Sequence, residues 1–479
     1  MPALNNFCGP AYRIPGVFPD ACINLLPQLN EKSGQPWMKM IPGLRPFATV
    51  GKGPIRSMWS NIFTSYVVSG GQVYQLNADG TSLLIGPIAN GVNPAITVSN
   101  GSQLAFASNA QAFIAPGGGA GVLPLNDIYG TPINALTMAF IDQYFVAGFY
   151  NSKTIIISDF APDGSTWDPG NEAAKEAYSD NIQRVWVDQP GGEYIFLIGT
   201  ETTEVWVDTG ALFPFQRVQG AVFPIGTDSP WSVAGAGGFR AWLWRGVVYG
   251  CQGFQPTRIS DYGVEAAIAT TSVLDQQSAE SFSWIDQGHI YWTISFPISG
   301  LSFTYDLSMQ SWHRRQYWIN GAWGRYRPRV TAYAYGKQLV GDYATNQIYQ
   351  LDPTYFYDAN NQLLRRQRIT PYLGDNLKND RFNALRIEMQ TGVGLNVAPT
   401  ALGYNPQVIL RYSNDRGDTW SNNIQRTAGK VGKTLTRVTF SPLGSSRVGF
   451  VADVSMVDPV PTAFLSAWLD ISPSTWPRN

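Results

Sequence analysis

The sequence predicts an all-β protein built around a β-propeller, and three observations lead to this fold class. Aromatic residues make up 13% of the 479 residues, and 48 glycines and 32 prolines divide the chain into short segments. Aromatic side chains favour pleated, half-buried surfaces, whereas Gly and Pro favour turns. Between about residues 46 and 360, strand-like runs alternate with turns, and the lack of intervening helices favours a propeller over a chain of β-sandwich domains.

Residues 1–45 form the first expected segment. The stretch is irregular and rich in proline, with "PGVFPDACINLLPQ" followed by "MIPGLRPF". We expect an extended arm that lies over neighbouring structure and has no core of its own. The start of the chain has no basic region followed by an apolar stretch, so we expect no signal peptide. No window approaches the ~18 uninterrupted apolar residues of a membrane span.

Residues 46–365 form the expected propeller, because pairs of strand-like runs flank Gly, Asn or Ser turns. A blade takes ~40–50 residues in known repeat families, so this region has room for roughly six to eight blades. The run "QVYQL" (72–76) nearly repeats as "QIYQL" (347–351). The segment "YDLSMQSWHRR" is typical of the end of a blade, where a Trp packs between blades. A helix is predicted at residues 170–181, as a short insertion between blades.

Residues 366–479 form the expected C-terminal β-sandwich-like domain, since five or more strand-like runs occur within about 95 residues. The character of the chain changes near residue 365, where "LLRRQRITPYLGDNLKNDR" is the most charged stretch. We interpret Arg365, Arg366 and Arg368 as part of a solvated linker. The alternative is that they contact phosphate or an acidic partner.

The composition limits the possible partners. Lys plus Arg number 33 and Asp plus Glu number 34, a net charge of −1, and charged residues are 14% of the chain. A dedicated nucleic-acid binder shows a basic excess or stripe, so we expect any contact with DNA to be passive. The cysteines Cys8, Cys22 and Cys251 form no C-x-x-C motif. We expect reduced thiols of a protein made in the cytoplasm, with a Cys8–Cys22 pair left open.

The stretch "SNDRGDTW" resembles the Asp-box, a hairpin-turn motif of sialidases and other β-propellers. The turn can be ordered by a carboxylate that accepts amide hydrogen bonds, a glycine that takes a positive φ, and a Trp that packs under the hairpin. In sialidases the motif lies away from the catalytic centre, so we interpret it as a structural turn. The motif residues are Ser413, Asp415, Gly417 and Trp420.

Other motifs predict no chemistry. A second Asp-box candidate at 161–170 has Ala161 in place of Ser, and its Asp163 lies one residue too close to Trp167. The stretch "GKVGKTLT" (429–436) lacks the first Gly of a phosphate-binding loop and continues as a strand, so it predicts a hairpin. The Gly-rich "APGGGAGV" (115–122) predicts a loop.

Candidate catalytic and metal-binding residues are few. His289 and His313 are the two histidines, and without a Cys/His cluster at ligand spacing they predict no metal site. The acids Glu201, Glu204 and Asp208 could form a glycosidase pair, but Glu201 and Glu204 would lie on opposite faces of a strand. We therefore expect no catalytic residues, no cofactor and no metal.

Several short motifs, taken in their order along the chain, resemble those of a known protein family. Asn-Leu-x-Pro in "CINLLPQ" is followed by a Pro-Gly-Leu-x-x-Phe and a Gly-Pro-x-Arg element, and "GTETTEVWVDTG" contains Thr-Glu-x-Trp. Together with "GCQGFQPTRISDYGVEAAI" and the block from "YSNDRGDTW" to "FVADVS", they resemble the tail hub proteins of short-tailed bacteriophages. These are also called nozzle or packaged-DNA stabilisation proteins. The residues of the short elements are Pro42, Gly43, Leu44, Phe47, Gly53, Pro54, Arg56, Thr203, Glu204 and Trp206.

The resemblance implies a structural virion protein of the phage tail, assembled in the host cytoplasm. Such a subunit forms a ring, typically a hexamer, below the portal and its adaptor. The ring retains packaged double-stranded DNA, forms the channel for genome ejection and carries tail fibres, tailspikes or a needle. The family brings no catalytic residues. The alternative is a propeller-type glycoside hydrolase, sialidase-like or a depolymerase, which would need an arginine triad converging with a carboxylate pair in the central funnel.

Overall fold

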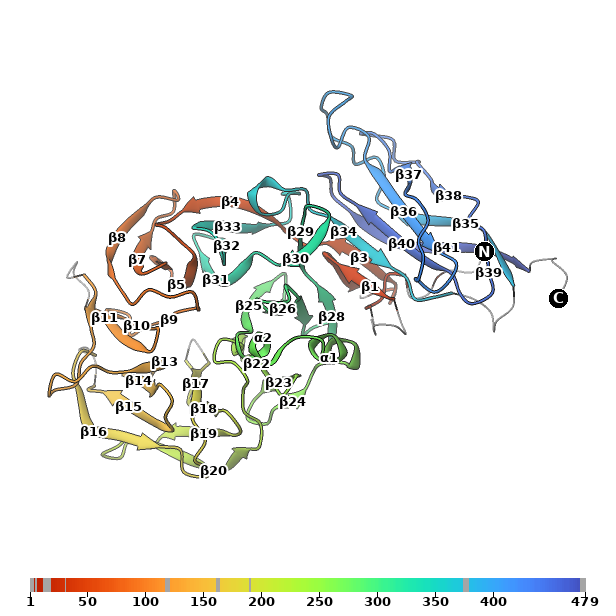
Figure 1. The fold of residues 1–479 in the computed structure, drawn as a ribbon. Helices are drawn as coiled ribbons and strands as arrows, with labels where there is room; N and C mark the ends of the chain where they lie inside the picture. The colour runs from red at the N-terminus through yellow and green to blue at the C-terminus, as the bar shows by residue number, and fades with distance from the viewer. Residues whose placement is uncertain are drawn as a thin grey trace.

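The computed structural model describes residues 4, 7–11, 19–30, 32–116, 121–160, 164–188, 191–373 and 379–473. Over these residues the chain is almost entirely β-strand. It forms a propeller of seven described blades with a β-sandwich attached at one side (Figure 1). The predicted fold class is therefore confirmed, and the blade number lies within the predicted six to eight.

Each blade is a four-stranded antiparallel sheet. Blade 1 consists of β5 (Ile55–Ser60), β6 (Ser65–Ser69), β7 (Gln72–Leu76) and β8 (Ser82–Pro87). Blade 2 consists of β9 (Ile96–Ser99), β10 (Leu104–Ser108), β11 (Gln111–Ala115) and β12 (Leu123–Pro124). Blade 3 consists of β13 (Ala135–Ile141), β14 (Tyr144–Phe149), β15 (Thr154–Ser158) and β16 (Trp167–Ala174). Blade 4 consists of β17 (Ile182–Val187), β18 (Tyr194–Gly199), β19 (Thr203–Asp208) and β20 (Phe215–Phe223).

The remaining blades follow the same pattern, with one exception at the end. Blade 5 consists of β21 (Ala234–Ala236), β22 (Phe239–Trp244), β23 (Val247–Gln252) and β24 (Thr257–Arg258). Blade 6 consists of β25 (Glu280–Asp286), β26 (His289–Ser295), β27 (Ser302–Asp306) and β28 (Ser311–Arg314). Blade 7 consists of β31 (Pro328–Ala334), β32 (Lys337–Asp342), β33 (Gln347–Asp352) and β4 (Gly43–Thr49). The outer strand of blade 7 thus comes from the N-terminal part of the chain and closes the ring of blades.

The near-repeat of the sequence reflects this geometry. "QVYQL" is β7 and "QIYQL" begins β33, so the two runs are the third strands of neighbouring blades 1 and 7. First strands of neighbouring blades contact one another, as β5 contacts β9 and β31, and they surround the propeller axis. The two near-identical runs therefore occupy the same position in two blades.

The core is divided into clusters between neighbouring blades. Second strands such as β10 are buried along their whole length, because each blade packs between two others. Trp312 lies in the cluster between blades 5 and 6, and its indole N–H donates to the carbonyl of Ile259 at 2.9 Å. The prediction of a Trp packed between blades in this segment is confirmed.

Two short helices lie between blades 5 and 6, α1 (Tyr262–Ile268) and α2 (Val273–Gln277). Their N-caps are Asp261 and Ser272, whose side chains accept amide hydrogen bonds in the first turn. The helix predicted at residues 170–181 is wrong. Its first part belongs to β16, which pairs with β15, and the rest is a loop held by buried side chains of blade 4.

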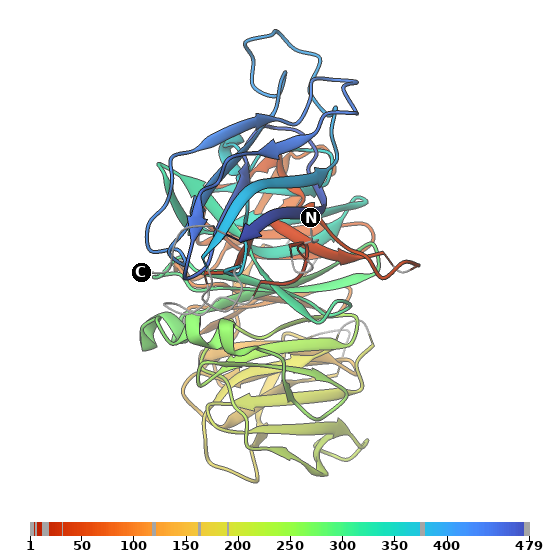
Figure 2. The same ribbon diagram turned by 90° about the vertical axis from the view of Figure 1, so that its right-hand side faces the viewer.

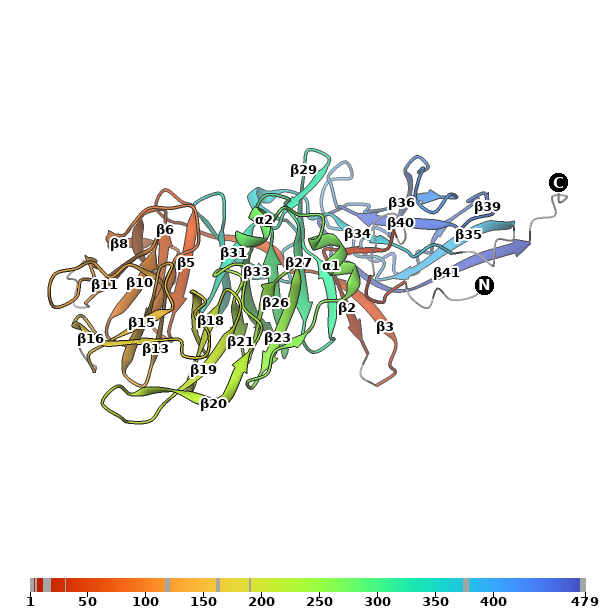
Figure 3. The same ribbon diagram turned by 60° about the horizontal axis from the view of Figure 1, so that its bottom comes forward.

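The sandwich consists of two sheets. One sheet continues blade 6 through β1 (Ala21–Ile23) into β34 (Arg366–Ile369), β40 (Val451–Met456), β36 (Gln407–Ser413) and β37 (Ile424–Thr427). The other contains β2 (Leu25–Leu29), β3 (Pro36–Met40), β41 (Ala463–Pro473), β35 (Asp380–Met389), β38 (Val438–Phe440) and β39 (Ser445–Ser446). Figure 2 shows the molecule from the sandwich side, and Figure 3 shows the sandwich extending away from the propeller along β35 and β41.

The N-terminal segment joins the two parts. β1 pairs in parallel with β28 of the propeller and antiparallel with β34 of the sandwich. β2 and β3 form a hairpin on the edge of β41, and β4 then enters blade 7. The expected arm therefore consists of strands that pair with the propeller and the sandwich of the same chain. The domain boundaries at residues 45 and 365 stay predictions. Two small elements complete the described fold, the hairpin of β29 (Gln316–Ile319) and β30 (Ala322–Arg325) and the 3-10 helix η1 (Ala359–Asn361).

A search of the described residues found no helix with the length and apolar character needed to cross a membrane.

Candidate functional site

The motifs of the N-terminal segment hold the architecture together. The Asn24 side-chain amide donates to the carbonyls of Gln316 and Arg365, at 2.8 Å each, and so links propeller and sandwich. Gly43 lies against the backbone of Tyr355, where a Cβ atom would come within 2.1 Å of the carbonyl oxygen. Only glycine allows β4 to approach the chain this closely.

Arg56 ties blade 1 to blade 2. Its guanidinium is fully buried and donates to the carbonyls of Gly70 and Ala89 at 2.9 Å, of Asn93 at 2.7 Å, and to the Ser108 hydroxyl at 2.8 Å. Burial lowers the pKa of Arg56 to about 10, so the group stays charged at neutral pH. The arginine of the Gly-Pro-x-Arg element thus satisfies backbone carbonyls and leaves no donor directed at a ligand.

Glu204 of the Thr-Glu-x-Trp element has a comparable role in blade 4. Its buried carboxylate accepts the amides of Glu176 and Ala177 and the Trp206 indole N–H, at 2.9 to 3.2 Å. The buried Lys175 ammonium lies 2.7 Å from Asp180. These contacts hold the loop after β16, which is why residues 170–181 do not form the predicted helix.

The predicted acidic candidates do not converge. Glu201 lies in the turn before β19, exposed and paired with Arg245 at 2.6 Å, whereas Glu204 is buried within the strand. Asp208 lies at the far end of β19 and accepts the amide of Gly210. The three acids therefore do not form a glycosidase pair.

The propeller axis carries the arrangement nearest to an arginine triad. Arg325 and Arg329 both form ion pairs with Glu280, and Arg329 also donates to the carbonyl of Val92 at 3.0 Å. Burial alone would raise the pKa of Glu280, but the two guanidinium groups hold it below its ordinary value. All three side chains are buried, and the two arginines already pair with Glu280. They therefore do not form a site for the carboxylate of a substrate.

The interpretation of Arg365, Arg366 and Arg368 as a solvated linker is wrong. Arg366 and Arg368 are fully buried in β34, in the middle of the joint sheet. Arg366 donates to the carbonyl of Asp458 at 2.6 Å, and Arg368 forms an ion pair with the buried Asp20. The alternative, contact with an acidic partner, is met inside the same chain by Asp20. Through this pair the sandwich is joined to the N-terminal segment.

The Asp-box residues form a hydrogen-bonded turn after β36. The Ser413 hydroxyl donates to the Asp415 carboxylate at 2.6 Å and accepts the Gly417 amide at 2.8 Å. Asp415 also accepts the Thr419 amide at 2.9 Å, and these hydrogen bonds, Ser413 first, lower the pKa of Asp415 to about 2. Gly417 has φ of 105°, and Trp420 lies half-buried with the Arg411 guanidinium 5.1 Å from its ring centre.

The histidines and cysteines are bound into the fold. His289 lies 2.7 Å from Asp306, and burial followed by the Arg315 charge lowers the pKa of His313. Cys8, Cys22 and Cys251 are free and buried, so the open alternative of a Cys8–Cys22 disulfide is excluded. Among the described residues, no group of His, Cys, Asp and Glu could hold a metal ion.

The remaining glycine-rich motif within the described residues does not have the geometry of a phosphate-binding loop. Residues 429–436 form turns between β37 and β38, with no helix N-terminus to face a phosphate. Residues 117–120 of the Gly-rich loop, and Ala161 and Asp163 of the second Asp-box candidate, lie outside the described residues.

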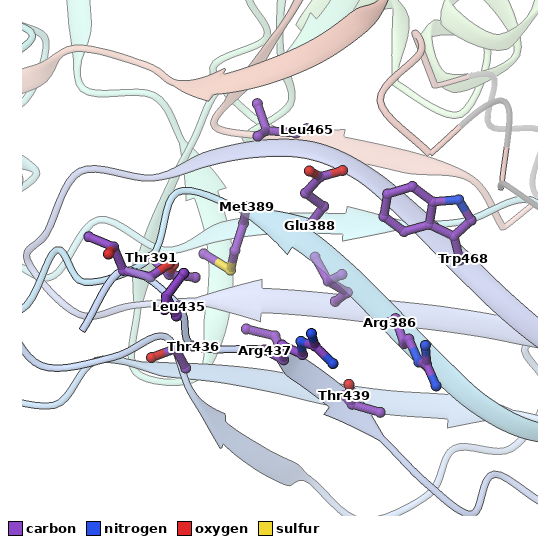
Figure 4. A pocket seen from close by; sticks show the side chains of 13 residues that line it. Arg386, Glu388, Met389, Thr391, Leu435, Thr436, Arg437, Thr439, Leu465 and Trp468 are labelled. Atoms are coloured by element: carbon purple, nitrogen blue, oxygen red, sulfur yellow. The ribbon is translucent and has the colours of Figure 1, made fainter.

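An open groove on the sandwich is the strongest candidate binding surface. It has a volume of about 530 Å³ and lies on the outward face of the sheet, across β38, β35 and β41 (Figure 4). Leu435 is 93% exposed and Leu465 is 37% exposed, so apolar side chains face solvent here. The lining residues used below, which we call the sandwich groove, are Arg386, Met389, Leu435, Arg437, Leu465 and Trp468.

The groove displays cationic groups without internal partners. Arg386 lies opposite Trp468 and Thr439 in the sheet, and Arg437 directly precedes β38. Neither guanidinium forms a hydrogen bond or ion pair with the described residues, whereas Glu388 accepts the Ser466 hydroxyl at 2.7 Å. Sequence reasoning missed this groove because Leu465 and Trp468 are three residues apart, so strict alternation would place them on opposite faces. The irregular register of β41 against Glu388 and Met389 brings both to the groove.

A propeller of seven described blades and an attached β-sandwich define the class of β-protein to which the described chain belongs. A family model described as "Bacteriophage P22 Gp10, beta-propeller" matches residues 18–356, and one described as "Bacteriophage P22 Gp10, beta-sandwich" matches residues 365–472. The chain therefore belongs to the bacteriophage P22 Gp10 family, the phage tail and packaged-DNA stabilisation proteins, and it is a phage structural protein. No curated protein matches the sequence significantly.

Three of the solved structures similar to the chain have TM-scores below 0.5. The computationally designed Ika8 protein is 9% identical, with 64% of this chain and 99% of that chain covered and a TM-score of 0.40. The extracellular domain of a putative hybrid two-component system from B. thetaiotaomicron is 10% identical, with 87% and 58% covered and a TM-score of 0.43. The Neurospora crassa Pan2 WD40 domain is 8% identical, with 62% and 88% covered and a TM-score of 0.38.

Proposed function

We propose that the chain is a subunit of the tail hub, or nozzle, of a short-tailed phage. In this role copies form a ring, most simply a hexamer, below the portal and adaptor. The ring retains packaged DNA, forms the exit channel at genome ejection and supports fibres, tailspikes or a needle. The observation that carries the proposal is the match of both halves of the chain, in order, to the two domains of one phage tail family.

The charge of the chain supports passive contact with DNA. With a net charge of −1, the chain has no basic excess that would bind phosphates and slow the passage of DNA. Few charges and many aromatic side chains also suit permanent interfaces between subunits. Assembly then takes place in the host cytoplasm, and the virion tail is the final location.

We also propose that the protein has no enzymatic activity and that the Asp-box turn is structural. Both axial arginines form ion pairs with Glu280, and the turn residues bond to one another, which supports both statements. The division into an arm, a propeller and a sandwich near residues 45 and 365 belongs to the same proposal.

The function is tested with phage particles made without this chain. Heads should fill and then lose their DNA, measured as DNA that becomes sensitive to nuclease. Addition of the purified chain to freshly filled heads should restore protection. Particles that keep their DNA without the chain would contradict the proposed role in retention.

A further inference from the structure

The propeller carries a surface that complements the sandwich groove. Four carboxylates, Asp142, Asp159, Glu193 and Asp208, lie at the turns and strand ends of blades 3 and 4 and form no ion pair with the described residues. We call these four residues, with the apolar side chains among them, the acidic patch.

The centre of the acidic patch is apolar. Tyr144 packs edge-on against Phe160 at 5.4 Å and Phe215 at 5.8 Å between ring centres. Phe160 is 62% exposed, and Leu212, on the loop after Asp208, is fully exposed. An apolar centre with a charged rim is the usual anatomy of a protein interface.

The carboxylates of the patch already repel one another. Partial desolvation, and then the charges of Asp208 and Glu193, raise the pKa of Asp142. No cation of the described chain relieves this repulsion. The groove is lined by Arg386, Arg437 and the Glu388 carboxylate, so its net charge is positive, opposite to that of the patch. These groups surround an apolar centre formed by Leu435, Leu465 and Trp468.

The two surfaces cannot meet within one chain. β14 to β20, which carry the acidic patch, lie at one end of the molecule, and β35, β38 and β41 lie at the other (Figure 1). A contact between them must therefore join two copies. Because the surfaces differ, the contact is head-to-tail, which generates a ring when the rotation between copies closes.

We propose that the sandwich groove of one copy binds the acidic patch of the next copy. Arg386 and Arg437 pair with the carboxylates of Asp142 and Asp208, and the exposed Leu212 and Phe160 pack against Leu435, Leu465 and Trp468. The inference rests on the proposed ring and names the surfaces that build it. In this contact the arginines of the sandwich groove and the carboxylates of the acidic patch neutralise one another.

Charge reversal tests the contact in the full-length chain. One variant carries Arg386→Glu and Arg437→Glu, and the other carries Asp142→Lys and Asp208→Lys. Assembly is measured by size-exclusion chromatography with mass determination, and the fold by circular dichroism. Each variant alone should stay folded and lose assembly by at least about tenfold in concentration, because like charges then meet at the interface. Matched controls, Arg381→Glu on the same strand β35 and Asp418→Lys in the sandwich, should assemble like the unaltered chain.

Mixing the two reversed variants makes the test specific. In an alternating assembly every groove again faces a patch of opposite sign, so the mixture should form rings although neither component does. General destabilisation would not be cured by mixing. Rings formed by either variant alone, or a mixture that stays monomeric, would overturn the inference and leave the ring itself standing. If the unaltered chain forms no ring, also with portal and adaptor present, both the inference and the proposed ring fail.

Discussion

The interior of the propeller and the outer face of the sandwich use their charged side chains in opposite ways. In the propeller, Arg56 is saturated by carbonyls and Glu280 is held by two arginines, so the buried charges are used to join blades. In the sandwich, Arg386 and Arg437 face solvent beside exposed leucines. The difference indicates that buried charges hold the propeller blades together, whereas the charges on the outer face of the sandwich, like those of the acidic patch, are available to a partner.

The largest expected effect comes from breaking the axial cluster of the propeller. Glu280→Ala leaves Arg325 and Arg329 buried without a counter-charge, which should lower the free energy of unfolding by about 3–5 kcal/mol. Chemical denaturation followed by tryptophan fluorescence measures this. The control Glu201→Ala removes an exposed pair and should cost less than about 1 kcal/mol. Equal effects of the two changes would contradict the idea that axial charges hold the blades together.

The next largest effect concerns the junction between the two regions. Arg368→Ala removes the buried ion pair with Asp20, and should cost about 3 kcal/mol and loosen the sandwich from β1. Calorimetry should then resolve a separate transition for the sandwich. The double variant with Asp20→Ala should recover part of the loss, because both charges of the pair are then removed. A single unchanged transition would show that the junction does not depend on this pair.

A third effect is a pH dependence that belongs to blade 7. Asp358 is buried beside Arg327 and Asp342, and burial raises its pKa from 3.8 to about 7. Because the folded-state pKa exceeds the unfolded one, the folded chain binds the additional proton, and this group lowers stability as pH rises from about 4 to about 7. The loss between pH 5 and pH 8 should be about 2 kcal/mol.

The matched variant Asp358→Asn removes the titrating group and keeps its shape. Thermal unfolding at several pH values should show a smaller loss of stability above pH 5 in the variant than in the unaltered chain. Parallel curves for the two proteins would contradict the assignment to Asp358.

The smallest effect is expected at the Asp-box turn. Asp415→Ala removes the hydrogen bonds that the carboxylate accepts from the Ser413 hydroxyl, the Thr419 amide and the Thr419 hydroxyl in an exposed turn, and should cost about 1 kcal/mol. Hydrogen exchange should increase locally in residues 413–420, and assembly should not change. Loss of assembly by this variant would give the turn a role in contacts that the sandwich groove does not explain.

Part of this architecture is readable from local sequence. The repeat of "QVYQL" as "QIYQL" and the Trp at the end of a blade report positions that recur in every blade, so local patterns suffice. The helix at 170–181 was predicted wrongly because Glu204 and Lys175 impose tertiary contacts that helix propensity cannot compete with. The caps Asp261 and Ser272 were readable signals of the helices that do form.

Other features depend on distant pairing and stay hidden in the sequence. Arg366 and Arg368 have the composition of an exposed linker, and only their place between β1 and β40 buries them. The sandwich groove combines residues from 386 to 468, which are brought together by the register of β35, β38 and β41. Its charges become visible only when the internal partners of each arginine are known.

The most direct test of the proposed function is electron microscopy of the parent virion labelled with antibody to this chain. The account predicts label on the short tail, below the portal vertex and above the attached appendages, in a ring around the DNA channel. Label on the capsid surface, on the tips of the appendages or absent from the particle would contradict the assignment as a tail hub.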